Sequence, residues 1–187
     1  MPPQAKITRE MILDAAFDLV RSEGHEALTA RRLAGALGCS TQPILYQFES
    51  IGKIMEETYR RADDCHTAFL TEGLESEADP LLALGLRYIR FGAREKPLFR
   101  FLFQSGRFSG KTLEEMTSGP EIAALLEIVS RSAGIDPEAA LMMFRTLFIA
   151  VHGYASLLAN NAMAWDPAAA EATLAVLYSG LTEQRRG

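Results

Sequence analysis

The 187-residue chain lacks the features that mark several common classes of protein. Its two cysteines, Cys39 and Cys65, are too few for a disulfide framework and have no metal-ligand spacing with the three histidines. Alternating β-branched residues are almost absent, and there is no Asn-Gly or Asp-Gly hairpin turn. His-Glu-x-x-His, glycine-rich phosphate-loop and Gly-x-Ser-x-Gly motifs are missing as well, so the sequence predicts no enzymatic activity, metal or cofactor.

Uninterrupted apolar runs and a strong excess of one charge are also missing. The most apolar stretch, residues 141–159, contains Arg145 and His152, which argues against a membrane span. The polar start MPPQAKITRE is unlike a signal peptide, so we expect a cytoplasmic protein with no membrane partner. The net charge is −5, and residues 1–60 carry seven basic and eight acidic side chains. Net charge therefore gives no sign of a nucleic-acid ligand, although phosphate contact needs only local donors.

The chain does contain helix-forming residues in amphipathic order, and 48% of its residues are apolar. This pattern predicts an all-α fold of about nine helices with a sizeable core. We divide it into residues 1–50, a bundle of three short helices, and residues 51–187, a larger helical domain. Three Asp-Pro pairs combine an N-cap with a proline in the first turn and predict helix starts. The later helices are expected over residues 50–75, 81–94, 120–133, 138–160 and 168–181, with a loop at 106–119 that has room for one or two helical turns.

Residues 28–48, LTARRLAGALGCSTQPILYQF, predict two short helices joined by a three-residue turn. Thr29 is placed to cap the first helix, and Gly38 ends it where a left-handed residue is needed. Ser40 is placed to cap the second helix through the N–H of Gln42, because Pro43 at the third helical position has no N–H. This is the shape of a helix-turn-helix that binds DNA.

The outward face of the second helix suits the major groove of duplex DNA. Ile44 and Phe48 lie four residues apart and face inward, which leaves Thr41, Gln42 and Tyr46 pointing outward. A glutamine amide in the first turn can pair with an adenine edge, and a tyrosine hydroxyl can donate to a phosphate. The same spacing also fits an ordinary helical hairpin with solvated polar residues.

Basic side chains near this unit are candidate phosphate contacts: Lys6, Arg9, Arg31, Arg32 and Lys53. The candidate DNA-binding residues are Thr29, Arg31, Arg32, Ser40, Thr41, Gln42, Pro43, Leu45, Tyr46, Gln47 and Lys53. They define double-stranded DNA as the expected partner.

The helix expected over residues 138–160 is apolar almost all round, so it must be buried on every face. In a chain this small, part of that burial is expected from a second subunit. The last helix, residues 168–181, has large apolar residues on one face and small residues on the other. We therefore predict a homodimer through the last two helices, which form a four-helix bundle across the interface. A large monomeric core is the alternative.

Aromatic residues of the middle helices are candidates for a ligand pocket, because aromatic walls with few polar groups suit a hydrophobic or aromatic compound. His152 interrupts an apolar helix and could hold the polar end of a ligand. The same residues could equally form only core. The candidate ligand-binding residues are Cys65, Phe69, Tyr88, Phe91, Phe99, Phe103, Phe144, Phe148 and His152.

The pattern ILDAA…EG…LT.RRLA.ALG.S…LY.F, within residues 7–55, resembles the N-terminal domain of TetR/AcrR-type transcriptional regulators. The segments YIRFGAREKPLFRFLF and VHGYASLL are similar to the C-terminal type named for a Trp-His-Gly motif, with Val151 at the tryptophan position. The family usually has tyrosine where this chain has Leu45, and its helix-4 lysine usually lies closer to the aromatic residue than Lys53 lies to Phe48. The matching anchors are Ala15-Ala16, Gly24, Leu28-Thr29, Leu33-Ala34, Leu37-Gly38, Ser40 and Phe48.

The resemblance implies a homodimeric, ligand-responsive regulator, expected to be a repressor, that binds a pseudopalindromic operator with its recognition helices about one DNA turn apart. A small hydrophobic or aromatic effector in the C-terminal domain would pivot the fourth helix and release the DNA. An activator remains open. The alternative from another class is a helical small-molecule-binding protein or enzyme whose N-terminal bundle does not bind DNA.

Overall fold

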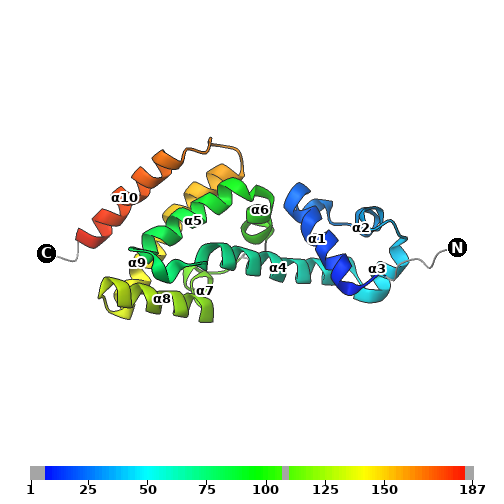
Figure 1. Ribbon diagram of the computed structural model, residues 1–187, viewed down its shortest axis with the longest axis horizontal. Coiled ribbons are helices and arrows are strands. Elements are labelled where there is room, and N and C mark those ends of the chain that lie inside the picture. Colours follow the sequence, from blue (N-terminus) through cyan, green and yellow to red (C-terminus); the bar gives the residue numbers. More distant parts are fainter. Residues whose placement is uncertain (1–6, 107–109, 184–187) are drawn as a thin grey trace. The chain divides into compact units, whose positions relative to one another are not determined.

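The structure, a computed structural model, describes residues 7–106 and 110–183. Within these ranges it contains ten α-helices, two short 3₁₀ turns and no strand (Figure 1), which confirms the predicted all-α fold. The chain forms two compact units. The first contains Met1–His66 and Pro97–Arg107, and the second contains Thr67–Lys96 and Phe108–Gly187.

The first unit is built on three short helices that share one core. They are α1 (Arg9–Glu23), α2 (Ala30–Ala36) and α3 (Thr41–Phe48), with a 3₁₀ turn, η1 (His25–Ala27), between α1 and α2. Most of α4 (Ile51–Thr71) and of α6 (Lys96–Gln104) also belongs to this unit. The buried apolar side chains of the three-helix bundle are Ile12, Ala16, Leu19, Val20, Leu28, Leu33, Ala34, Ile44 and Phe48.

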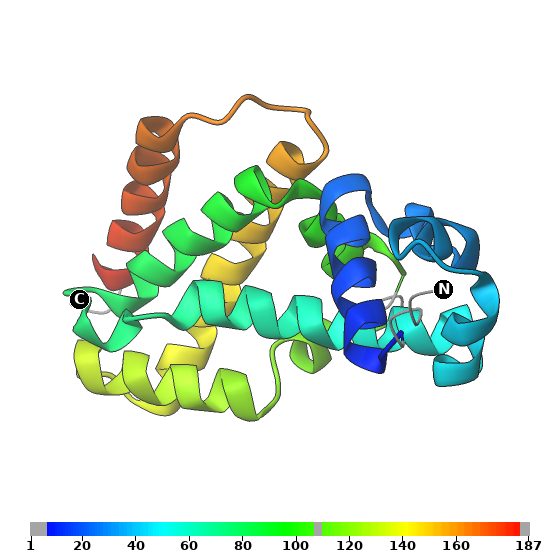
Figure 2. The same cartoon turned by 45° about the vertical axis from the view of Figure 1, so that its right-hand side comes forward.

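The second unit is organised around two helices, α5 (Pro80–Arg94) and α9 (Pro137–Ala159), which run alongside each other (Figure 2). The two backbones approach closely at Gly92, where an added Cβ would lie only 2.7 Å from the Ala155 Cβ. The other elements of the unit are η2 (Leu74–Ser76), α7 (Leu113–Met116), α8 (Pro120–Ala133) and α10 (Pro167–Glu183).

The Asp-Pro pairs begin helices as predicted. Asp79, Asp136 and Asp166 each accept a backbone N–H of the first turn, at distances between 2.9 and 3.1 Å. Pro80 and Pro137 occupy the first turns of α5 and α9, where a missing N–H removes no intrahelical bond.

One expectation about the middle of the chain needs correction. The helix expected to continue to about residue 75 ends at Thr71, because Gly73 is left-handed (φ +66°) and η2 follows with Leu74 buried. The inward face of α4 advances in steps of four residues from Ile54, so it carries His66 at its end, whereas Cys65 is half-buried.

By length and composition alone, helix α9 could cross a membrane. Within the described ranges no other helix is both long and apolar enough to do so. Eight of its residues are nevertheless buried inside the unit, as in the core helix of a globular domain. Arg145, near its middle, donates from Nε to Thr117 Oγ1 at 3.0 Å. This satisfied polar contact fits a packed core helix, in which buried polar groups have partners.

Candidate functional site

Helices α2 and α3 form the helix-turn-helix that the sequence predicts. Thr29 caps α2, its Oγ1 accepting the Arg32 N–H at 3.2 Å. Gly38 has φ +62°, a left-handed conformation that a side chain would strain. The Cys39 N–H then donates to the Ala34 carbonyl at 3.0 Å and fixes the turn that leads into α3.

The two faces of α3 differ sharply in exposure. Ile44 and Phe48 are almost fully buried against the bundle. On the opposite face Gln42 is exposed, and Tyr46 has 86% of its surface accessible. Thr41 and Leu45 are also exposed, whereas Pro43 is half-buried. The exposed side chains of α3 are therefore accessible to a partner as large as duplex DNA.

The predicted cap by the Ser40 side chain is wrong. Ser40 occupies the N-cap position with an extended backbone, yet its hydroxyl makes no capping hydrogen bond. A serine cap usually bonds the N–H of the second or third helical residue, and Pro43 at the third position has none. The exposed Ser40 hydroxyl is left at the start of α3, together with backbone N–H groups that lack a side-chain cap.

Gln47 and Arg9 both make contacts within the first unit, although the Arg9 side chain is about half exposed. Gln47 donates from Nε2 to the Ile7 carbonyl at 3.4 Å, and its own carbonyl accepts Arg9 Nη1 at 2.8 Å. The Arg9 guanidinium also lies 3.9 Å from the Phe48 ring centroid and pairs with Glu57. These contacts link α1 to the end of α3 and to α4, so both side chains already have partners within the first unit.

The candidate phosphate donors differ in how far they are engaged. Arg31 is exposed and forms no ion pair within residues 7–106 and 110–183. Arg32 pairs with Glu23 across the bundle. Lys53 Nζ lies 3.6 Å from Glu56, which Arg60 also contacts at 3.1 Å; these partners, Arg60 foremost, lower the pKa of the Glu56 carboxyl. Lys6 lies outside the described residues.

The junction between α3 and α4 is strained. Glu49 has φ +63° and ψ −39°, and the Ser50 N–H donates across it to the Phe48 carbonyl at 2.6 Å. This is a γ-turn of the rare kind with positive φ. A side chain at such a position costs on the order of 1 kcal/mol or more, and the surrounding bundle must supply that energy.

The candidate ligand-binding aromatics form three clusters. In the second unit, the Phe69 and Phe91 rings meet edge to face at 5.5 Å, and Phe148 lies 6.2 Å from Phe144 and 5.4 Å from His152. In the first unit Phe99 and Phe103 lie 4.9 Å apart. Sequence analysis missed His66, whose ring meets Phe103 at 5.2 Å and whose pKa burial lowers to about 4. The four-residue step from Ile54 along α4 is the signal that could have found it.

The most polar of these clusters pairs Tyr88 with His152. The Tyr88 hydroxyl lies 2.8 Å from His152 Nδ1, in hydrogen-bond contact. Burial raises the pKa of the Tyr88 hydroxyl and lowers the pKa of the His152 imidazole, so both groups are neutral near pH 7. Tyr88 and Phe144 are buried, whereas Phe148 and His152 are only half-buried and can be reached from outside.

Residues 81–181, just over half of the chain, match the family described as "Tetracyclin repressor-like, C-terminal domain". The chain belongs to the TetR family. No curated protein matches it closely enough to add a named relative. For this TetR-family regulator the matched range begins in α5 and ends in α10, so the helix-turn-helix lies outside it and rests on the geometry of α1, α2 and α3.

Proposed function

We propose that this TetR-family protein is a homodimeric repressor that binds a pseudopalindromic operator through α3. The observation that carries the proposal is the exposed face of α3, where Gln42 and Tyr46 project from a helix whose other face is fixed by buried Ile44 and Phe48. A helix anchored in this way can enter the major groove with its first turn toward the bases.

The roles of the exposed residues follow from their chemistry. The Gln42 amide can donate to and accept from an adenine edge, so it is proposed to select bases. Arg31, with no internal ion pair among the described residues, and the Tyr46 hydroxyl are proposed phosphate contacts. Ser40, Thr41 and the uncapped N–H groups at the start of α3 add hydrogen-bond donors on the same side.

The exposed apolar side chains of α9 and α10 support a homodimer through these helices. Met142, Ile149 and Leu157 follow one another at steps of seven and eight residues, so they share one face of α9, and each is about half or more exposed. Val176 on α10 is 76% exposed. An isologous pairing of these faces would bury all four side chains, two helices coming from each subunit.

Light scattering tests the dimer. We expect a mass near twice the 20.6 kDa of the chain at micromolar concentration, and a shift toward the monomer in Ile149→Glu, which would bury a charge in the interface. Leu113→Glu, the same kind of change on α7, should leave the mass unchanged. A monomeric wild-type protein would contradict the proposal.

A small aromatic or hydrophobic effector is proposed to bind at the half-buried Phe148–His152 edge of the second unit. A ligand shifts a regulator only by its difference in affinity between two states, and a 100-fold preference for the DNA-free state corresponds to about 2.7 kcal/mol. We place the protein in the cytoplasm, where operator DNA is accessible. Effector-driven release of DNA should weaken in Phe148→Ala.

Mobility-shift titration with the DNA upstream of its own coding sequence tests operator binding. We expect salt-sensitive binding to a specific fragment, and a relaxed sequence preference in Gln42→Ala. If Gln42→Ala lowered the affinity for every DNA sequence equally, base selection by Gln42 would be refuted. Absence of salt-sensitive binding to any such fragment would favour the second candidate, a small-molecule-binding protein whose bundle does not bind DNA.

A further inference from the structure

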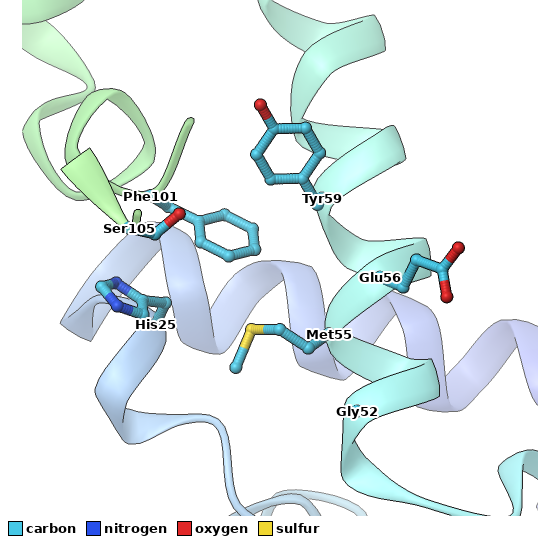
Figure 3. A pocket seen from close by; sticks show the side chains of 7 residues that line it. All are labelled: His25, Gly52, Met55, Glu56, Tyr59, Phe101 and Ser105. Atoms are coloured by element: carbon cyan, nitrogen blue, oxygen red, sulfur yellow. The ribbon is translucent and has the colours of Figure 1, made fainter. Parts of the chain in front are cut away.

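The first unit contains a cleft of about 350 Å³ that no candidate residue of the sequence analysis lines (Figure 3). Its volume lies at the lower end of the range for small-molecule sites. Three segments far apart in the sequence build it: η1, the first half of α4, and α6 with the residue that follows it. The lining residues are His25, Gly52, Met55, Glu56, Tyr59, Phe101 and Ser105.

The walls of the cleft are mainly aromatic. The His25 imidazole stacks on the Phe101 ring at 5.6 Å with an angle of 21° between the planes. Tyr59 meets Phe101 edge to face at 5.5 Å, and its hydroxyl is held by donation to the Leu102 carbonyl at 3.1 Å. Met55 extends from α4 toward His25 and offers a polarisable thioether (Figure 3). Flat rings and a thioether form favourable contacts with another flat ring.

The charged groups around the cleft argue against an ionic occupant. No lysine or arginine lines it, so an anion would find no counter-ion there. Glu56 is directed away from the other lining side chains (Figure 3) and is already engaged by Arg60 and Lys53. A cation would therefore find no uncommitted carboxylate. Both findings favour a neutral molecule.

One polar atom in the cleft is positioned for a directional contact. The Ser105 Oγ is buried and has no hydrogen-bond partner among the described residues. A buried hydroxyl without a partner is costly, and a ligand that bonds to it removes that cost. Gly52, on the α4 side of the cleft, leaves space there, since an added Cβ would meet nothing closer than Ser50 Oγ at 3.7 Å.

We propose that this cleft is a binding site for a small neutral planar aromatic molecule that carries one hydrogen-bonding group. The ring lies against the His25–Phe101–Met55 walls, and its polar group bonds to Ser105 Oγ. The occupant contacts segments on both sides of the helix-turn-helix, because His25 precedes α2 and Gly52 follows α3. Any effect of this occupant on DNA affinity rests on the proposed function, whereas its binding does not.

Methionine-methyl NMR on the full chain tests the proposal with two probes, phenol and toluene, which differ by one hydroxyl. We expect both to shift the Met55 methyl resonance in a saturable manner, with a dissociation constant on the order of 1 mM for phenol. The resonance is assigned with Met55→Leu. A saturable shift at Met142 or Met143 alone would place the ligand on α9, and it would overturn the cleft while leaving the proposed effector site intact.

Two substitutions separate the contribution of the Ser105 hydrogen bond to binding from the contribution of the space in the cleft. Ser105→Ala should lower the affinity for phenol by about two- to tenfold, because one neutral hydrogen bond is lost. The affinity for toluene should not change. Ser22→Ala, the same change on the exposed surface of α1, is the matched control. Gly52→Leu should fill the cleft and weaken both probes at least tenfold, while Gly52→Ala should not. Equal phenol affinity in wild type and Ser105→Ala, or undiminished binding in a folded Gly52→Leu protein, would overturn the assignment.

Discussion

Arg9 and Arg31 are both basic residues of the first unit, yet their surroundings differ, and we expect different roles for them. Arg9 is engaged with the Gln47 carbonyl, the Phe48 ring and Glu57. Arg31 is exposed and forms no ion pair in the part of the chain that is described. Replacing each by methionine keeps the aliphatic stem and removes only the charge and its donors. The two variants therefore test whether Arg9 positions α3 and whether Arg31 contacts phosphate.

Arg9→Met should destabilise the first unit. A cation–π contact at an exposed site contributes about 0.5–1 kcal/mol, and a hydrogen bond from a charged donor about 1.5–3 kcal/mol. Because the Arg9 side chain is about half exposed, solvent screening reduces the sum, and we expect a loss of about 1–2 kcal/mol. Arg31→Met should leave the free energy of unfolding unchanged within about 0.5 kcal/mol.

The salt dependence of DNA binding should change in Arg31→Met and not in Arg9→Met. One lost phosphate contact lowers the slope of log affinity against log salt by about 0.9, which is roughly a 3.5-fold change between 50 and 200 mM. We expect this change for Arg31→Met. Arg9→Met should lower affinity by the same factor at every salt concentration. The assays are anisotropy titrations on an upstream duplex and urea denaturation. A flattened slope with unchanged stability in Arg9→Met would refute the assigned roles.

Three further outcomes follow from the packing and titration of the chain. Gly92→Ala should lower the free energy of unfolding by about 1–3 kcal/mol in urea denaturation, since its Cβ would meet Ala155 at 2.7 Å; unchanged stability would mean that α5 and α9 do not approach so closely. Glu49→Gly should raise stability by about 1 kcal/mol by relieving the positive φ, and a lower midpoint in the same assay would contradict the strain. Burial lowers the pKa of His66 to about 4, whereas the unfolded chain binds that proton below about pH 6.5, so stability should fall by about 3 kcal/mol as the pH drops through this window. His66→Leu should remove most of that fall, and an unaltered pH profile would exclude His66 as its cause.

Local signals in the sequence were sufficient for most of the helix boundaries. The Asp-Pro starts, the Thr29 cap and left-handed Gly38 each involve residues within a few positions of one another, so composition and spacing capture them. The predicted Ser40 cap, which also involves neighbouring residues, was wrong. The sequence identifies a suitable residue but does not show whether its hydroxyl reaches an N–H. Cys65, a candidate ligand-binding residue, is half-buried, and the neighbouring His66 is the buried residue of the pair.

Contacts between distant segments could not be predicted from spacing. Arg9 is a candidate phosphate donor from its place in the sequence, and nothing local indicates its contacts with Gln47 and Glu57, which lie 38 and 48 residues away. The cleft at His25 and Ser105 could not be predicted from the sequence for the same reason, because its lining residues come from three separate segments. Periodicity assigns a side chain to the inside or outside of its own helix, and it does not say what packs against that side chain.

Selection of binding sites from a pool of randomised DNA duplexes, with the purified full-length protein, tests the central claim most directly. A homodimer that contacts bases through α3 predicts enrichment of two inverted half-sites whose centres lie about one helical turn, roughly 34–36 Å, apart. The enrichment should weaken in Gln42→Ala. Failure of the wild-type protein to enrich any sequence, or enrichment of a single half-site without its inverted repeat, would contradict the account.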